Sequence, residues 1–315
     1  MELVSLGKTG LGVSRLCFGT LTMGPLQANL PLEYGADLMV LAFNLGVNFV
    51  DTAEIYETYS YIKRAIQIFK KRPIISTKSY AYTRLDAKRS LEKALSELTV
   101  DYIDMFLLHE QESEFTLKGH REALEFYLDA KQRGLIRAVG ISTHHIAAVN
   151  AASETPEIDV IHPIINKEGV GIVDGTLVEM EDAIKRAYRA GKGIYSMKAL
   201  GGGGLINSYE ESLKYMMDFP YVHSIAMGMQ TEEEVIKNVC MFENTDAPKE
   251  VEDKLQKRRR LLHIEDWCIK CEKCARRCKQ GAIKLIDGEM DIDHKKCVLC
   301  GYCTTACKNG AIKIY

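Results

Sequence analysis

Several features that define other protein classes are missing from this chain of 315 residues. No apolar run approaches the roughly 18 residues that a membrane-spanning helix needs. The opening, MELVSLGKTG, has neither a basic n-region nor an apolar h-region. No low-complexity segment interrupts the sequence. These absences predict a cytoplasmic protein in a reducing compartment, without a membrane partner.

Charge is distributed unevenly along the chain. From Lys249 to the C-terminus there are 16 basic and 10 acidic residues, whereas residues 1–248 carry 25 basic and 33 acidic ones. The only dense basic run, residues 257–260, falls on an expected helix. A solvated helix face, or a contact with the acidic part of the chain, explains this run better than nucleic-acid binding, which we do not expect.

Eight of the ten cysteines lie in two copies of the spacing C-x2-C-x2-C-x3-C. The runs are Cys268, Cys271, Cys274 and Cys278, and then Cys297, Cys300, Cys303 and Cys307. A cubane cluster needs four thiolates around one core, and short C-x2-C steps let one loop wrap it. Zinc sites more often pair C-x2-C units across longer loops, and disulfides are not expected in a reducing compartment. The spacing therefore predicts two [4Fe–4S] clusters.

The tail is also an internal repeat, with Cys278-Lys-Gln-Gly-Ala-Ile-Lys-Leu matching Cys307-Lys-Asn-Gly-Ala-Ile-Lys-Ile. From about residue 264 to 315 it resembles the bacterial-type dicluster ferredoxins. The resemblance implies that the fourth cysteine of each run crosses to the other cluster. One ligand set is then Cys268, Cys271, Cys274 and Cys307, and the other is Cys297, Cys300, Cys303 and Cys278.

Two further expectations concern the residues around these runs. The family usually has proline after each fourth cysteine, but Lys279 and Lys308 stand there, and their charge should raise the cluster potentials. The two remaining cysteines, Cys17 and Cys240, lie in apolar contexts and are expected to be buried hydrophobic residues.

The first 240 residues alternate between β-type apolar runs and helical patterns with apolar residues at i, i+3 and i+4. The predicted strands are Arg15–Gly19, Asn48–Thr52, Pro73–Lys78, Tyr102–His109, Ile136–Ser142, Val160–Ile165, Gly193–Lys198 and His223–Gly228. The predicted helices are Glu33–Leu45, Tyr59–Lys71, Leu85–Leu98, Gly119–Arg133, Ile146–Ala152, Leu177–Ala190, Tyr209–Phe219 and Thr231–Cys240. The segment Leu6–Gly10 is expected to be a tight turn between two short strands.

This alternation predicts an α/β fold, a (β/α)8 TIM barrel followed by a small α+β dicluster ferredoxin-like domain. The alternative is an open doubly wound sheet, which is less favoured because no G-x-G-x-x-G follows the first strand. We expect a barrel over residues 1–242, a helical linker over 243–262 and a ferredoxin-like domain over 263–315.

The linker contains a predicted charged helix, Lys249–Leu262. Val251, Leu255 and Leu262 fall near one face of it and need a surface to bury against. We therefore expect the ferredoxin tail to pack against the barrel, at its C-terminal face or rim.

Polar residues follow successive predicted strands, where barrels carry their chemistry. Asp51 and Tyr56 follow the second strand, Lys78 ends the third and His109 ends the fourth. With Leu-Gly-Lys-Thr-Gly, Phe-Gly-Thr and Val-Gly-Ile-Ser, these positions resemble the aldo-keto reductases over about residues 1–240. The resemblance implies that Tyr56 is a general acid whose pKa Lys78 lowers. It also implies that Asp51 holds Lys78 and that His109 orients the carbonyl.

Elementary chemistry agrees with these roles. A phenol ordinarily has a pKa of about 10 and gives up its proton reluctantly, and a neighbouring ammonium stabilises the phenolate. A histidine beside a forming alkoxide can donate a hydrogen bond to it. Taken singly, each residue is better explained as structural or surface polar. The four together, in family order at strand ends, favour the catalytic interpretation.

The resemblance also implies a nicotinamide cofactor, NAD(H) or NADP(H). Its expected contacts are Gly19, Thr20, Ser142, His162, Asn166, Met197, Leu200, Gly201, Gly202 and Asn238. Backbone N–H groups from Leu200 to Gly203 would serve a pyrophosphate. Several positions depart from the family: Thr143 replaces an asparagine, His162 a glutamine and Met197 an aromatic. Glu234 stands where an arginine often holds the 2′-phosphate, which makes NADP less favoured.

Two functions remain open from the sequence. The first is a reductase of a small carbonyl compound that takes electrons from NAD(P)H, from the two clusters, or from both, with a redox protein as a further partner. The second is an electron-transfer or redox-sensing module whose barrel is only a docking domain. The nucleotide pocket separates them, because without a bound nucleotide the four polar residues lack their usual hydride source.

Overall fold

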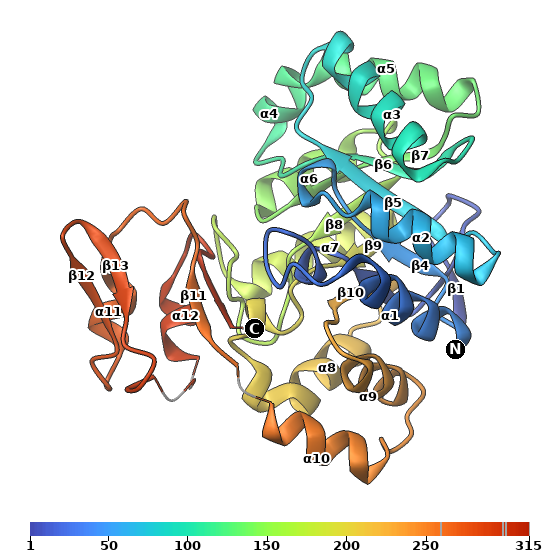
Figure 1. The fold of residues 1–315 in the computed structure, drawn as a ribbon. Helices are drawn as coiled ribbons and strands as arrows, with labels where there is room; N and C mark the ends of the chain where they lie inside the picture. Colours follow the sequence, from blue (N-terminus) through green and yellow to red (C-terminus); the bar gives the residue numbers. More distant parts are fainter. Residues whose placement is uncertain (259, 298, 300, 315) are drawn as a thin grey trace.

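The computed structural model describes residues 1–258, 260–297, 299 and 301–314 of the chain. Eight parallel strands close into a barrel, in the order β10-β3-β4-β5-β6-β7-β8-β9 (Figure 1). They are β3 (Leu16–Gly19), β4 (Phe49–Asp51), β5 (Ile74–Ser79), β6 (Ile103–Leu108), β7 (Ile136–Thr143), β8 (Val160–Pro163), β9 (Gly193–Ser196) and β10 (Ser224–Gly228). The predicted barrel is confirmed, and the open doubly wound sheet is excluded.

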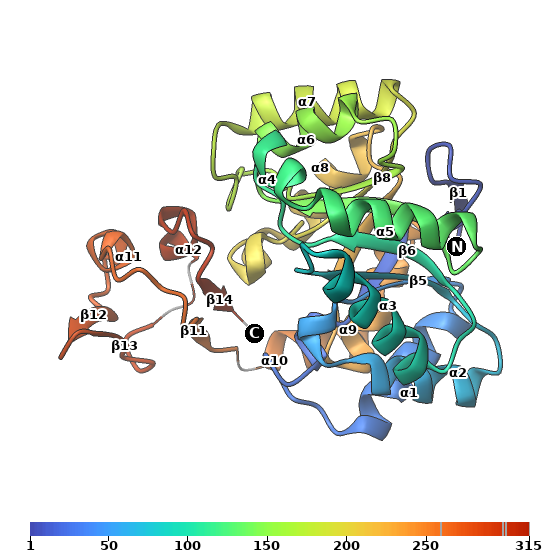
Figure 2. The ribbon, with the colours of Figure 1, turned by 90° about the horizontal axis from the view of Figure 1, so that it is seen from above.

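Helices surround the barrel and bury their apolar faces against it (Figure 2). They are α1 (Leu32–Asn44), α2 (Tyr59–Phe69), α3 (Arg84–Leu98), α4 (Glu114–Gly119), α5 (Arg121–Gln132), α6 (Ile146–Glu154), α7 (Leu177–Arg189), α8 (Tyr209–Asp218) and α9 (Glu232–Phe242). Threonine side chains cap the first turns of α3, α7 and α9, each accepting a backbone N–H. Among the described residues, no helix is both long and apolar enough to cross a bilayer.

The predicted strands and helices all occur, and the short helix α4 was not predicted. The predicted helix Gly119–Arg133 occurs as α5 (Arg121–Gln132), and α4 precedes it, separated from it at His120. Ser113 begins α4 because its side chain accepts the N–H of Phe115. That cap was a readable start signal in the sequence.

A hairpin formed by β1 (Leu3–Ser5) and β2 (Gly12–Ser14) confirms the predicted turn at residues 6–10. Its residues Leu6, Leu11 and Val13 are buried in the same core cluster as Phe49 and Met105 of the barrel strands. Because these strand residues precede the carboxyl ends of their strands, the hairpin packs at the end of the barrel opposite the carboxyl-end face.

The linker helix α10 (Lys249–Lys257) is shorter than predicted. The expected helix to Leu262 was wrong, because Arg258 is extended and Leu262 begins strand β11 (Leu262–Ile264), where it pairs with Ile314. Val251 is buried, and Lys237 of α9 pairs with Glu252 at 2.7 Å. The helix therefore lies against α9.

In its described residues, the C-terminal domain contains two short two-stranded antiparallel sheets and two short helices. Strand β11 pairs with β14 (Ile312–Ile314), and β12 (Ile283–Ile286) pairs with β13 (Glu289–Ile292). The helices α11 (Lys273–Arg277) and α12 (Tyr302–Ala306) each precede the fourth cysteine of one run. Leu262, Ile283 and Ile312 form its core together with several cysteines.

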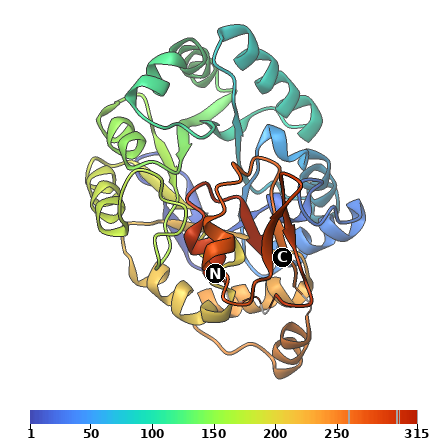
Figure 3. The same ribbon diagram turned by 90° about the vertical axis from the view of Figure 1, so that its left-hand side faces the viewer.

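The C-terminal domain is seated on the carboxyl-end face of the barrel, in front of the ring of helices in Figure 3. The contact is made by the short helix η3 (Gly201–Gly203), which follows β9, and by β14 and α12. Asn207 also donates a hydrogen bond of 2.9 Å to the carbonyl oxygen of Leu299. The expectation that the tail packs on this face is confirmed.

Glycine is needed at three positions of the seam, the interface between the barrel and the C-terminal domain, because the two domains approach too closely there for a side chain. A Cβ on Gly203 would lie 2.2 Å from the carbonyl oxygen of Ile314, and one on Gly204 would lie 2.0 Å from Oγ1 of Thr304. A Cβ on Gly301, from the other side, would lie 2.1 Å from the carbonyl oxygen of Gly204. The lack of side chains in the glycine run after β9 therefore lets the ferredoxin domain pack closely against the barrel.

Candidate active site

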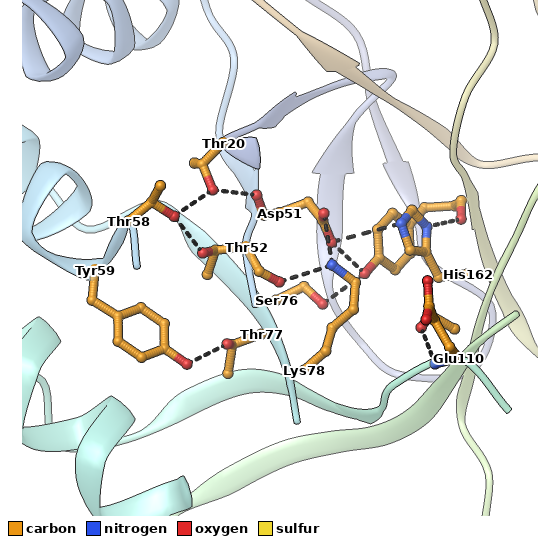
Figure 4. A network of polar contacts seen from close by, with 12 residues as sticks. Thr20, Asp51, Thr52, Thr58, Tyr59, Ser76, Thr77, Lys78, Glu110 and His162 are labelled. Atoms are coloured by element: carbon orange, nitrogen blue, oxygen red, sulfur yellow. Dashed lines mark hydrogen bonds and ion pairs between the residues drawn. The ribbon is translucent and has the colours of Figure 1, made fainter. Parts of the chain in front are cut away.

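The four polar residues predicted at the strand ends meet at the mouth of the barrel. Asp51 ends β4 and Lys78 lies in β5, where both are buried. The Lys78 ammonium is 2.8 Å from Oδ2 of Asp51 and donates to the carbonyl oxygen of Thr52, also at 2.8 Å (Figure 4). This ion pair is held from two sides, so the lysine has a fixed position in the barrel interior.

The second oxygen of Asp51 is held by Tyr195 of β9, a residue that the sequence patterns did not indicate. The Tyr195 hydroxyl donates to Oδ1 of Asp51 at 2.8 Å and also bonds Ser76 at 2.7 Å. His162 stacks on the Tyr195 ring with centroids 3.9 Å apart. Tyr195 is fully buried, and only its inward position in a strand could have suggested this role.

Tyr56 and His109 lie beside the Lys78–Asp51 pair. The Lys78 ammonium is 5.1 Å from the centre of the Tyr56 ring, and the Tyr56 and His109 rings are 5.8 Å apart at a steep angle. His109 also stacks on Tyr80 at 4.5 Å. Its Nδ1 is buried and has no hydrogen-bond partner among the described residues. The four predicted residues are thus neighbours in space.

Burial controls the protonation of this group. It raises the pKa of Tyr56 well above its ordinary value, and the Asp51 carboxylate raises that pKa further, so the phenol holds its proton. The net shift is therefore upward, opposite to the lowering by Lys78 that the resemblance implied. Burial, followed by the Lys78 charge, lowers the pKa of His109 well below its usual range. The site therefore offers a protonated phenol and a neutral imidazole.

A cavity of about 390 Å³ extends from Tyr56 to the linker helix, which is within the size range of ligand pockets. Residues from the barrel, α9, α10 and the ferredoxin domain line it. Of the residues predicted to bind a nucleotide, Gly19, His162, Met197, Leu200, Gly202 and Asn238 line this cavity. Burial lowers the pKa of His162 to about 4, so His162 presents a neutral ring there.

Four predicted nucleotide contacts do not line the cavity: Thr20, Ser142, Asn166 and Gly201. Thr20 bonds Thr58 at 2.8 Å. Ser142 accepts the N–H of Glu110. Both polar atoms of the Asn166 side chain bond the backbone of its own loop, at Val170. The polar atoms of Thr20 and Asn166 thus serve the local backbone and neighbouring side chains.

Two of the four backbone N–H groups expected to hold a pyrophosphate, those of Gly201 and Gly203, are used within their own turn. Gly201 donates to Lys198, Gly203 to Leu200, and Gly204 to Gly201. These donors face carbonyl oxygens of the same segment. The clearest structural role of this segment is its close contact with the ferredoxin domain, described above.

Glu234 does not stand alone at the far end of the cavity. Its carboxylate pairs with the guanidinium of Arg258, and Arg260 approaches it at 3.7 Å. Both arginines come from the segment after α10. The repulsion expected between Glu234 and a phosphate is therefore offset by a part of the chain that lies outside the barrel.

The described cysteines of the two runs lie near one another in the C-terminal domain. Cys278 lines one small cavity together with Cys297 and Cys303. Burial raises the pKa of Cys274, and the nearby Cys307 and Cys268 raise it further. The Sγ atoms of Cys268, Cys278 and Cys307 each accept a backbone N–H, at 3.3 to 3.4 Å. Cys300, a predicted ligand, lies outside the described residues.

The donors in this domain are cysteine thiols, the residues that hold [4Fe–4S] clusters. Among residues 1–258, 260–297, 299 and 301–314, no three His, Cys, Asp or Glu side chains converge on one ion-sized point. A cubane instead spreads its four thiolates over separate irons. No disulfide joins the described cysteines. Of the two remaining cysteines, Cys17 is buried as predicted and Cys240 is partly buried.

Comparison with known proteins assigns both parts of the chain. The profile of the aldo/keto reductase family matches residues 15–251, and that of the 4Fe-4S dicluster domain matches residues 267–312. Over 215 residues the chain is 25% identical to the L-galactose dehydrogenase of Arabidopsis thaliana, covering 64% of this chain and 66% of that protein. It is 24% identical to the oxidoreductase YqkF of Bacillus subtilis, covering 74% of this chain and 89% of YqkF.

Solved structures resemble the barrel. A Pseudomonas aeruginosa protein assigned to the aldo-keto reductases superposes with a TM-score of 0.66 at 26% identity, over 77% of this chain and 95% of its own. The aldo-keto reductase AKR11C1 of Bacillus halodurans gives a TM-score of 0.66 at 20% identity, over 82% of this chain and 96% of its own. The second likeness concerns the fold alone.

Proposed function

Since the chain belongs to the aldo/keto reductase family of oxidoreductases, we propose that it reduces a small carbonyl compound at the barrel mouth. The observation that carries this proposal is the buried Lys78–Asp51 pair, at 2.8 Å, beside Tyr56 and His109 at one end of the cavity. Catalytic side chains of barrel enzymes lie at this face.

Each residue has one role in the proposal. Tyr56 gives its phenolic proton to the carbonyl oxygen as that oxygen gains negative charge. The Lys78 ammonium favours the phenolate left behind, and Asp51 keeps Lys78 charged and in place. His109, as a neutral imidazole, donates a hydrogen bond to the same oxygen. The raised pKa of Tyr56 supports a resting state in which its phenol is protonated.

The proposed cofactors are a nicotinamide dinucleotide and two [4Fe–4S] clusters. Reduction of a carbonyl to an alcohol takes two electrons and two protons, of which NAD(P)H supplies a hydride and Tyr56 the other proton. A [4Fe–4S] cluster exchanges single electrons. Gly19, His162, Met197, Leu200 and Asn238 would line the dinucleotide, and the two crossed cysteine sets would hold the clusters.

In this proposal the charges at the far end of the cavity no longer disfavour NADP. Glu234 is paired with Arg258, and Arg260 lies nearby, so the 2′-phosphate of NADP meets a cationic pair as well as a carboxylate. The proposed division into a barrel (1–242), linker (243–262) and ferredoxin domain (263–315) assigns this end of the site to barrel and linker together.

The experiment is a calorimetric titration of anaerobically purified protein with NADH and NADPH, followed by turnover with a panel of small aldehydes and ketones. The proposal expects binding of at least one nucleotide, reduction of at least one carbonyl, and about eight irons per chain, which is four for each cubane. If neither nucleotide binds and reduced protein transfers no electrons to any carbonyl, the electron-transfer or sensing module takes the place of this proposal.

A further inference from the structure

Two lysines cross the seam between the barrel and the ferredoxin domain, in opposite directions. Lys198 follows β9 of the barrel, and its Nζ would lie 3.7 Å from a Cβ built on Gly310 of the ferredoxin domain. Lys313, in β14, reaches back: its Nζ would lie 3.8 Å from a Cβ on Gly202 of the barrel. Both lysines line the cavity described above. The two ammonium groups therefore lie on the wall that the two domains share.

Neither lysine has an ion-pair partner among the described residues. The Lys198 Nζ bonds Nε2 of His144 at 2.8 Å, and the Lys313 Nζ bonds the carbonyl oxygen of Gly310 at 2.9 Å. Lys313 is only 7% exposed. Burial lowers the pKa of both lysines, and the Lys313 charge lowers the pKa of Lys198 further, whereas the Glu110 and Glu265 carboxylates raise the pKa of each.

The other charges along the cavity are matched within the protein. Asp51 pairs with Lys78, Glu252 with Lys237 at 2.7 Å, and Glu234 with Arg258. The two seam lysines are the exception within the described part of the chain. A buried ammonium without a counter-charge is costly, and a bound anion would remove that cost.

We propose that Lys198 and Lys313 form an anion-binding site, built half by the barrel and half by the ferredoxin domain, that holds a diphosphate or carboxylate group of a ligand in the cavity. Two ammonium groups at one wall suit a group with several anionic oxygens, because each lysine can donate to a different oxygen. The inference rests on the proposed function only in assigning the cavity to a ligand.

Two ligands could bring such a group. One is the diphosphate of the dinucleotide, for which two of the expected backbone donors, Gly201 and Gly203, are already used within the glycine turn. The other is the carboxylate of an oxo-acid substrate. In both cases the ligand would contact the ferredoxin domain directly, so that binding would fasten the cluster domain to the barrel mouth.

The internal repeat supplies a matched control. Lys284 occupies in the first repeat the position that Lys313 occupies in the second, in Gly-Ala-Ile-Lys in both copies. Lys284 lies in β12 and is exposed, whereas Lys313 is buried at the seam. The same substitution in the two repeats separates an effect of the site from an effect on the ferredoxin fold.

The test is anaerobic calorimetry on the full iron-loaded chain with three probes: inorganic pyrophosphate, NADH and pyruvate. Lys313→Met and Lys198→Met should each weaken binding of the relevant anion by about tenfold or more, the size expected for one charge-assisted hydrogen bond. Lys284→Met should leave that affinity within about twofold, as a remote exposed charge should. Lys313→Arg should restore most of it. Iron content checks that each variant is folded.

The pattern across probes identifies the ligand. Loss for pyrophosphate and NADH together assigns the site to the cofactor, and loss for pyruvate alone assigns it to a substrate carboxylate. The proposal is overturned if wild-type protein binds none of the three, if both seam variants bind as the wild type does, or if Lys284→Met weakens binding equally. Should Lys313→Met lose iron, Lys198→Met in the barrel decides the question. Because turnover is not measured, these results stand apart from the test of carbonyl reduction.

Discussion

Two lysine sites lie at one cavity but are built on different principles. Lys78 is paired with Asp51 at 2.8 Å and bonded to a backbone carbonyl, so the protein itself supplies its counter-charge. Lys198 and Lys313 face each other across a domain boundary and have no carboxylate partner within the described residues. The first arrangement is complete within the protein, whereas we propose that the second is completed by a bound anion.

The largest expected effect comes from breaking the paired site. Asp51→Asn leaves the Lys78 ammonium buried without its counter-charge, so the free energy of unfolding should fall by about 3–5 kcal/mol. Thermal or denaturant unfolding of the iron-loaded protein measures the loss.

A second ion pair on the same cavity is the control for that loss. Glu252→Gln removes the carboxylate that pairs with Lys237. The Glu252 and Lys237 side chains are 33% and 19% exposed, and the substitution should cost no more than about 1 kcal/mol. Equal losses for the two variants would mean that the Lys78–Asp51 pair is not buried as described.

The interface that brings Lys198 and Lys313 together can be disrupted without changing the Lys78–Asp51 pair. Gly204→Val introduces a Cβ that would lie 2.0 Å from Oγ1 of Thr304. The ferredoxin domain should then no longer pack closely on the barrel, and the contact between the two domains should be weaker by about 1–3 kcal/mol. Limited proteolysis near residues 243–262 should become faster. Gly119→Ala, where a Cβ meets nothing within 4 Å, is the control and should show no faster cleavage. Unchanged proteolysis in Gly204→Val would contradict the close seam.

A smaller effect should distinguish the two sites by pH. Burial lowers the pKa of Lys198 to about 7, with His144, Lys313, Glu110 and Glu265 as its charged and titratable neighbours. A protonated Lys198 holds an anion, so affinity for NADH should be constant below pH 7 and fall, by at most about tenfold per pH unit, as pH rises above it. Lys198→Met should flatten the profile. An affinity that increases from about pH 7 to 8 would have the wrong sign for this assignment.

Much of the fold could be predicted because the barrel repeats one local pattern. The apolar runs that became β3 to β10 are short and separated by amphipathic helices, so each unit carries its own signal. The cysteine spacing identified the second domain in the same way. The helix α4 was not predicted although Ser113 caps its start. The linker helix was predicted too long, because Leu262 pairs instead with β14, a strand distant in sequence.

The site was predictable where a residue's role is local to a strand end, and less so where two domains meet. Asp51, Tyr56, Lys78 and His109 could be proposed from their positions after successive strands. Tyr195 was missed because its hydroxyl bonds Asp51 from across the barrel. Lys313 and Lys284 have nearly the same sequence neighbours, yet only Lys313 is buried, because the barrel covers one repeat and not the other.

The most direct test of carbonyl reduction at this site is the rate of Tyr56→Phe at saturating nucleotide, in protein with verified iron content and NADH affinity. The proposed role of Tyr56 predicts a rate about 10²–10⁴-fold below the wild type, because loss of a general acid costs that much while the ring still fills its place. A variant that reduces the same carbonyl at the wild-type rate would contradict it.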